Sequence, residues 1–227
     1  MCSSDLGTAS HGGFRNIDIH DCRLVACATN IIPQVKFAND RRTGRKPLPG
    51  VDEKDVLSRI GIAVECVDGG LVDNVRIHDI TMTRCVQTPV FVRLGRRRER
   101  PGVKSSLQNV LIENVTGEAA SHIASSITGV PGLRPHGVTI RNCAFTVKGG
   151  AKLADCGEPV IEAEKAYPEN QMFDRHMLPA YGFYVRHADG VRFENVRVKG
   201  ATPDERPPLV ADDCTSVTAS GCSFSAP

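Results

Sequence analysis

The sequence has no tryptophan, and only 5% of its 227 residues are aromatic. It also lacks an excess of charge, because the formal net charge is +2, which is too small to indicate a nucleic-acid partner. No apolar run approaches the roughly 18 residues that a membrane-spanning helix needs, so we expect no membrane span. What the composition offers instead is 21 glycines and many β-branched residues, which is typical of short strands joined by tight turns.

Metal-binding patterns are absent as well. The chain has nine cysteines but no Cys-x-x-C pair, which argues against a zinc site. The histidines show no metal-ligand spacing; they include His78, His122, His136, His176 and His187. The sequence therefore predicts neither a metal site nor a cofactor.

Six segments of the chain can be laid over one another. Each reads as a small or polar residue, an aliphatic residue, a polar residue, an apolar or small residue, two polar residues and then Ile, Val or Cys. The segments are residues 14–24, 72–82, 107–117, 135–145, 188–198 and 214–224. A unit this short cannot bury its apolar face alone, whereas stacked copies can, so the repeat predicts a solenoid.

The spacing of the repeats indicates which solenoid. A register mark at the third position of each segment recurs after 58, 35, 28, 53 and 26 residues; the marks are Asn16, Asn74, Asn109, Gly137, Gly190 and Ser216. Val and Ile alternate with polar residues within the segments, as in strands, and there is little sign of a long amphipathic helix. Strands that return without a helical crossover predict an all-β fold, a parallel β-helix.

A second strand precedes several of the repeats, and Gly or Asp stands where the chain must turn between the two strands. These second strands are expected at residues 61–70, 89–95, 124–132, 181–190 and 208–214. Cys22, Cys143 and Cys222 share a repeat position that is otherwise Ile or Val. We therefore interpret them as small core residues rather than as part of a disulfide framework.

Two long excursions interrupt the rhythm, at residues 29–59 and 146–180. Such excursions from a solenoid usually lie on one face and help to shape its binding surface. The second is expected to pack back onto the strands through Tyr167, Met172, Phe173, Met177 and Leu178. For the first, a disordered loop is an equal alternative. Residues 7–227 are predicted to form one domain, whereas residues 1–6 lack the repeat pattern and look like a non-native artefact.

Several phrases of the sequence resemble glycoside hydrolase family 28, the polygalacturonases and their bacterial relatives. They are GIAVECVDGGLVDNVRIHDITM, PVFVRLG, SSITGVPG, YPENQMF, LPAYGFYVRHADGVRFENV and GGFRNI, and they cover nearly all of the chain from Gly7 onward. The resemblance implies a right-handed parallel β-helix that is secreted or periplasmic and acts on an anionic pectic polysaccharide. It also implies inverting hydrolysis, in which a carboxylic acid protonates the leaving oxygen and a carboxylate activates a water. We expect a monomer.

The family's catalytic motifs have no clear counterpart here. No Asn-Thr-Asp segment occurs, and the Asp212–Asp213 pair lies so near the C-terminus that we interpret both as corner residues. Ser10-His11-Gly12 imitates the family's histidine motif, but the strand that should follow it is missing. We therefore retain His11 only as a secondary catalytic candidate, with a turn histidine as the alternative. The catalytic carboxylates and the first coils are expected upstream of residue 1, so the chain as given is expected to be an inactive fragment.

Alternation along the second strands identifies side chains that could still contact a substrate. Glu65, Arg93, Tyr184 and Arg186 fall on outward positions and are the predicted substrate-binding residues. A guanidinium can hold a uronate carboxylate through two hydrogen bonds, and a tyrosine ring can cover the apolar face of a sugar. The alternative is that these are ordinary outward residues paired with one another.

A basic loop follows one of those strands and contains Arg96, Arg97, Arg98 and Arg100. It would attract a polyanion, unless it is simply a solvated turn. Two rival functions stay open. A non-catalytic polysaccharide-binding or structural β-helix needs no acid and base. A pectate lyase on the same fold would need clustered Asp ligands for calcium and an Arg base, and the sequence contains no such acidic cluster.

Overall fold

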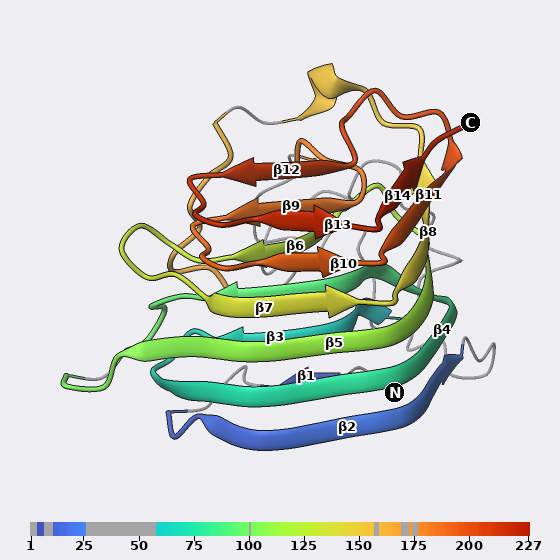
Figure 1. Ribbon diagram of the computed structural model, residues 1–227. Coiled ribbons are helices and arrows are strands. Elements are labelled where there is room, and N and C mark those ends of the chain that lie inside the picture. The colour runs from blue at the N-terminus through green and yellow to red at the C-terminus, as the bar shows by residue number, and fades with distance from the viewer. Residues whose placement is uncertain are drawn as a thin grey trace, which may run out of the picture.

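The computed structural model describes residues 4–6, 11–25, 58–99, 101–156, 159–168, 173 and 177–227. These residues form an all-β structure in which the only helix is a single 3-10 turn, Leu153–Asp155. Every pairing between two named strands is parallel, and the strands join into one curled sheet (Figure 1). The prediction of an all-β fold with parallel strands is therefore confirmed.

The first face of the curled sheet contains the six repeats. Its strands pair in this order: β2 (Phe14–Val25), the first part of β4 (Gly70–Leu94), β5 (Ser105–Ala119), β7 (His136–Arg141), β10 (Arg192–Glu194) and β13 (Thr218–Ser220). Paired residues are 58, 35, 28, 53 and 26 positions apart, the same spacings as in the sequence repeat. The predicted register is thus confirmed in all six strands.

The second face consists of the strands that precede the repeats. They pair in parallel in the order β1 (Ser4–Leu6), β3 (Ser58–Cys66), the last part of β4, β6 (Ser125–Thr128), β9 (Phe183–Arg186) and β12 (Leu209–Asp212). Figure 1 shows β3, β6, β9 and β12 behind the first face, with their arrows pointing the opposite way. Three of the residues that look non-native in the sequence, 4–6, belong to this face.

A third, shorter face follows the first. The last residues of β5 pair with β8 (Ala144–Gly149), β8 pairs with β11 (Arg197–Thr202), and β11 pairs with β14 (Ser223–Ser225). In Figure 1 these strands stand at one side, where β2, β4 and β5 bend upward. A single strand such as β4 therefore runs through the first face, bends into the third and ends in the second.

Two positions in every repeat adopt a left-handed backbone, and they make the corners. The first is the register mark, with φ between 54° and 67°: Asn16, Asn74, Asn109, Gly137, Gly190 and Ser216. The second lies five residues later, with φ between 51° and 62°: Asp21, Asp79, Asn114, Asn142, Asn195 and Gly221. Asn, Asp and Gly tolerate this conformation better than other residues, so their recurrence sets where the chain turns.

Side chains at the second corner also bond from one repeat to the next. Asn114 Nδ2 donates to Asp79 Oδ1 at 3.1 Å, and Asn142 Nδ2 donates to Asn114 Oδ1 at 3.4 Å. Asn195 Nδ2 continues the ladder with a 3.1 Å bond to Asn142 Oδ1. The corner residues therefore have two roles, since they turn the backbone and tie neighbouring repeats together.

The interior of the curled sheet is filled by columns of aliphatic side chains. One fully buried column contains Ile77, Ile112, Ile140 and Phe193. Cys143 is buried in another column, which confirms its interpretation as a core residue, and burial raises the pKa of its thiol to about 12. Cys222 occupies the same column and packs, partly buried, against the core. Cys22 also aligns with this column but is exposed, so the prediction that it is a core residue was wrong, because β2 is the end strand of this face among the described residues. All the cysteines whose side chains are described are free thiols.

The second excursion packs onto the outward side of the second face, as predicted. Phe173 and Leu178 are buried there in an apolar cluster with Phe91 and Tyr184, and this cluster is separate from the interior core. Met177 is buried too. Part of the excursion therefore forms a cover over the outward side chains of β4 and β9.

Two parts of that prediction have a different outcome. Tyr167 was expected to anchor the excursion, but it is 50% exposed, and its ring lies under the Arg97 guanidinium at 5.0 Å from the ring centroid. The expectation was wrong because the ring makes a cation–π contact with Arg97 at the surface and does not pack into the apolar cluster. Met172 lies outside the described residues, and so does the first excursion up to residue 57.

The corner ladder leads to a stability prediction at Asn114, where φ is 55°. We expect Asn114→Ala to lower the free energy of unfolding by about 1–2 kcal/mol, because alanine is strained in the left-handed region. Asn114→Gly removes the same side-chain bonds but adopts this φ freely, so its loss should be smaller. Urea denaturation of both variants measures the difference. An equal or larger loss for glycine would show that the ladder bonds, and not the backbone conformation, dominate.

Candidate functional site

The predicted substrate-binding residues lie on neighbouring strands of the second face. Glu65 on β3 is paired with Arg93 on β4, Arg93 with Thr128 on β6, and Thr128 with Arg186 on β9. They therefore share one outward column, although the segments between them differ in length. Tyr184 stands in the adjacent outward column of β9, two residues before Arg186. Because paired strands are about 4.8 Å apart, the two arginines are about 10 Å apart at their backbones.

This outward column is covered rather than open. Glu65 and Arg93 are each 2% exposed, and Tyr184 is 1% exposed. Arg186 is the most accessible of the four, with 15% of its side chain exposed. The second excursion contacts Arg93 through the Glu162 carbonyl and Tyr184 through Phe173, so it covers these two side chains. The substrate-binding role of all four stays a prediction.

Arg93 is held by uncharged acceptors. Its Nη1 donates to Thr128 Oγ1 at 3.2 Å and to the Gly129 carbonyl at 2.7 Å, and its Nη2 donates to the Glu162 carbonyl at 2.8 Å. Burial lowers the pKa of Arg93 to about 10, because removal from water disfavours the charged form. The guanidinium is still protonated at neutral pH, so the site keeps a positive charge beneath its cover.

Tyr184 lies between the apolar cluster and a carboxylate. Its ring packs edge-on against Phe173, with the centroids 6.5 Å apart. Its hydroxyl donates to Asp212 Oδ2 at 3.0 Å. Burial raises the pKa of this hydroxyl, so it remains a hydrogen-bond donor at any physiological pH. Phe173 packs against part of the Tyr184 ring, which would otherwise be free to contact a sugar.

Arg186 contacts the covering segment most directly. Its Nη2 lies 2.6 Å from Glu162 Oε1, and its Nη1 donates to the Val160 carbonyl at 2.6 Å. Its Nε lies 3.0 Å from Asp212 Oδ2, but the two are not aligned for a hydrogen bond, so this buried donor has no well-placed acceptor. The guanidinium thus binds one carboxylate well and a second one poorly.

His187 follows Arg186 at a corner of the second face, where its φ is 49°. It is buried, its Nδ1 lies 2.6 Å from Asp213 Oδ2, and its Nε2 lies 3.1 Å from Glu162 Oε2. The bonds from His187 and from Arg134, the latter at 2.7 Å, lower the pKa of Asp213.

The cluster is suited to binding an anion rather than to acid–base chemistry. A glycosidase acid must be protonated near neutral pH, which requires surroundings that disfavour its charge. Here Glu162 and Asp212 both lie within 3.0 Å of the Arg186 guanidinium, so each is paired with a cation rather than placed in apolar surroundings. Arg186 and His187 both contact the single carboxylate of Glu162, and such a pair of side chains is an arrangement that can hold a carboxylate ligand.

The other sequence candidates lie apart from this cluster or have a structural role. Asp213 has a φ of 46°, so it is a corner residue, as interpreted from the sequence. Asp212 ends β12 and contacts Tyr184. His11 lies in the bend before β2, and none of the described contacts joins it to Arg186. The paired aspartates are thus structural partners of the arginine site.

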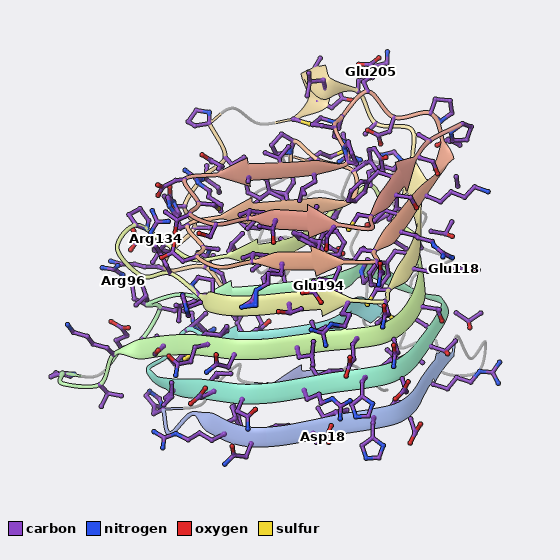
Figure 2. All side chains as sticks on the ribbon, in the orientation of Figure 1. Asp18, Arg96, Glu118, Arg134, Glu194 and Glu205 are labelled. Atoms are coloured by element: carbon purple, nitrogen blue, oxygen red, sulfur yellow. The ribbon has the colours of Figure 1, made fainter. Side chains whose placement is uncertain are left out.

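Two arginines of the basic loop contact other parts of the protein. Arg97 is buried in an ion pair with Asp68, and its Nε donates to Asp68 Oδ1 at 2.8 Å. Arg96 donates to the Pro131 carbonyl at 2.6 Å and lies 3.7 Å from Glu164. Figure 2 shows Arg96 and Arg134 at the same edge of the curled sheet, near the start of β7. Arg100 lies outside the described residues.

The sequence did not point to Glu162 or to the role of His187. Glu162 lies in the excursion, where no repeat exists to place it. His187 was considered only as a metal ligand, although its place directly after an outward arginine could have attracted attention. The part of the chain that the structure describes contains no group of three or more His, Cys, Asp or Glu side chains able to hold a metal ion. It also contains no helix long and apolar enough to cross a membrane.

Comparison with known proteins does not identify the chain. No protein-family model matches it, and neither the curated proteins nor the solved structures contain a significant match.

The lowered pKa of Asp213 predicts a pH-dependent contribution to stability. A carboxyl whose folded pKa is below its unfolded value of 3.8 stabilises the fold above that value and loses this effect as the pH falls through the folded pKa. We therefore expect Asp213→Asn, which keeps a residue tolerant of positive φ, to lower Tm at pH 7 and to approach the wild type at a pH below the folded pKa of Asp213.

Thermal melts between these two pH values measure the effect. Asp155→Asn, at an exposed position in the 3-10 turn, is the matched control and should change Tm little at any pH. A difference for Asp213→Asn that persists unchanged at the acidic end would contradict the ion-pair explanation.

Proposed function

We propose that this chain is a right-handed parallel β-helix of the polygalacturonase type that binds an anionic pectic polysaccharide. The register supports the β-helix: the six repeats pair in parallel and in chain order on the first face, and the strands between them do the same on the second. The family assignment rests on the sequence phrases, several of which form these paired strands.

One observation carries the choice of ligand. The Arg186 guanidinium already binds a carboxylate at 2.6 Å, and Arg93 stands in the same outward column. A galacturonate polymer presents one carboxylate on each sugar, so an arginine column on a parallel stack matches its repeating charge. The tyrosine beside them, Tyr184, adds a ring that can cover a sugar face once Phe173 moves away.

We further propose that the protein belongs to a glycoside hydrolase that cleaves galacturonosyl or related linkages by inversion. The acid and base would come from residues other than those of the arginine cluster, because Glu162 and Asp212 are already paired with the Arg186 guanidinium and the bonds from His187 and Arg134 lower the pKa of Asp213. The same observation favours a second candidate, a non-catalytic polysaccharide-binding module. The two candidates share the ligand and differ only in whether bonds are broken.

Binding is tested with the whole chain and polygalacturonate in affinity gel electrophoresis. We expect retardation that weakens as salt rises, and no retardation by fully methyl-esterified pectin, which lacks the charges. Arg186→Gln should reduce the affinity by about tenfold or more, because a hydrogen bond to a charged group contributes about 1.5–3 kcal/mol. Arg192→Gln, at an exposed position of the first face, is the matched control.

A reducing-sugar assay on the same preparations distinguishes hydrolysis from binding. Sustained release of reducing ends would support the hydrolase, with an acid and a base outside the arginine cluster. Binding without release would support the polysaccharide-binding module. Equal retardation by esterified and de-esterified pectin would contradict the carboxylate-based proposal.

A further inference from the structure

One carboxylate of the protein itself already fills the site that an anionic ligand would need. Glu162 Oε1 lies 2.6 Å from Arg186 Nη2, and Glu162 Oε2 lies 3.1 Å from His187 Nε2. Its side chain is still 32% exposed, so solvent and ligands reach the place where the contact forms. The geometry is that of a carboxylate bound between a guanidinium and an imidazole, and the carboxylate comes from the covering segment.

The covering segment is anchored firmly at both ends of the excursion. At one end the Ala151 amide donates to Asp204 Oδ2 at 3.2 Å, and the Glu205 amide donates to the Ala151 carbonyl at 3.1 Å. At the other, Arg206 Nη1 donates to the Leu178 carbonyl at 3.1 Å. Arg206 and Asp204 form an ion pair whose side chains are fully buried. Both ends of the excursion are therefore fixed to the same buried pair.

Between these anchors, residues 159–168 make polar contacts with the arginine column, while Val160, Ala163 and Ala166 pack against the outward apolar cluster. Three of their oxygens lie on Arg93 and Arg186: the carbonyls of Val160 and Glu162 and the carboxylate of Glu162. The next residue, Ala163, has a φ of 50°, which costs about 1–2 kcal/mol for alanine. A strained turn stays closed only if its contacts outweigh the strain, and the carboxylate contacts of Glu162 are the ones that another carboxylate can replace.

We propose that Glu162 is an internal ligand of a carboxylate site formed by Arg186 and His187, and that a uronate carboxylate of the polysaccharide replaces it. This inference rests on the proposed function, since it names the subsite at which the pectic chain first binds. Displacement of Glu162 removes one of the contacts that hold the segment closed and so favours relaxation of the turn at Ala163. Arg93 and Tyr184 then lose their cover and become accessible to neighbouring sugars.

The exchange has a defined effect on affinity. The ligand must compete with a carboxylate that is attached to the same chain and therefore present at a high effective concentration. Removal of that competitor should tighten binding, whereas removal of an ordinary structural residue should weaken it. The sign of the effect thus separates an internal ligand from a structural ion pair.

The test is isothermal titration calorimetry with trigalacturonate on the full chain. We expect Glu162→Gln to bind about tenfold more tightly than the wild type, because glutamine keeps the shape and can hydrogen-bond but carries no charge. Glu164→Gln is the matched control. Glu164 lies two residues away and is also partly exposed, and its ion pair with Arg96 is a loose contact at 3.7 Å. It should bind within about twofold of the wild type, as expected for an exposed pair. Galactotriose, which is uncharged, should not bind any of the three proteins.

Limited trypsin digestion adds a measurement that needs no substitution. Lys165 is exposed in the covering segment, and mass spectrometry can follow cleavage after it. Trigalacturonate should accelerate this cleavage in the wild type, and Glu162→Gln should be cleaved rapidly without ligand. If Glu162→Gln does not give a cooperative thermal melt, the wild-type digestion decides: acceleration supports the inference, and an unchanged rate at saturating ligand overturns it.

The possible failures are distinguishable. If the wild type binds trigalacturonate and a folded Glu162→Gln binds equally or more weakly, the internal-ligand inference is overturned while the proposed function stands. If none of the three proteins binds trigalacturonate, the proposed function is overturned, and the inference with it. Tight binding by Glu162→Gln alone supports the inference in its strongest form, a site fully masked by its own chain.

Discussion

The positive φ at two fixed positions of every repeat is the constraint on which the structure depends. Asn, Asp, Gly and, once, Ser occupy these positions, and each allows the chain to turn at the same place in the stack. Because the corners coincide, the strands between them fall into register, and inward and outward side chains form columns. The interior column of Ile77 and Ile112 and the outward column of Arg93 and Arg186 both follow from this one backbone feature.

The first face and the pairing of the second could be predicted from the sequence because both depend on local patterns. Alternation along a strand sorts inside from outside, and the register marks at Asn74 and Asn109 are visible as letters. The outward direction of Arg93 and Tyr184 was therefore correct. Their burial could not be predicted, since it depends on the second excursion, which has no repeat and packs according to tertiary contacts. For the same reason Glu162, the side chain that contacts Arg186, had no signal in the sequence.

Charge in the arginine site is balanced by the protein itself. Arg186 has Glu162 and Asp212 within 3.0 Å, and Asp213 is shared between His187 and Arg134. An incoming anion at such a site must replace a carboxylate that is already bound to the arginine. Its shape and its local concentration therefore matter more than net electrostatic attraction. This differs from Arg93, whose buried guanidinium donates to carbonyl and hydroxyl oxygens.

The spacing between equivalent corners ranges from 26 to 58 residues, yet the corners superpose throughout the stack. The register of the stacked strands thus depends on which residues stand at the corners and not on the length of chain between them. Segments inserted between corners are free to change in length and sequence without disturbing the scaffold, provided that they leave and return at the same points. The excursion between β8 and β9 is an example. It lies outside the repeat and covers outward side chains of β4 and β9, so its sequence can change what reaches that surface while the repeat keeps those side chains in place.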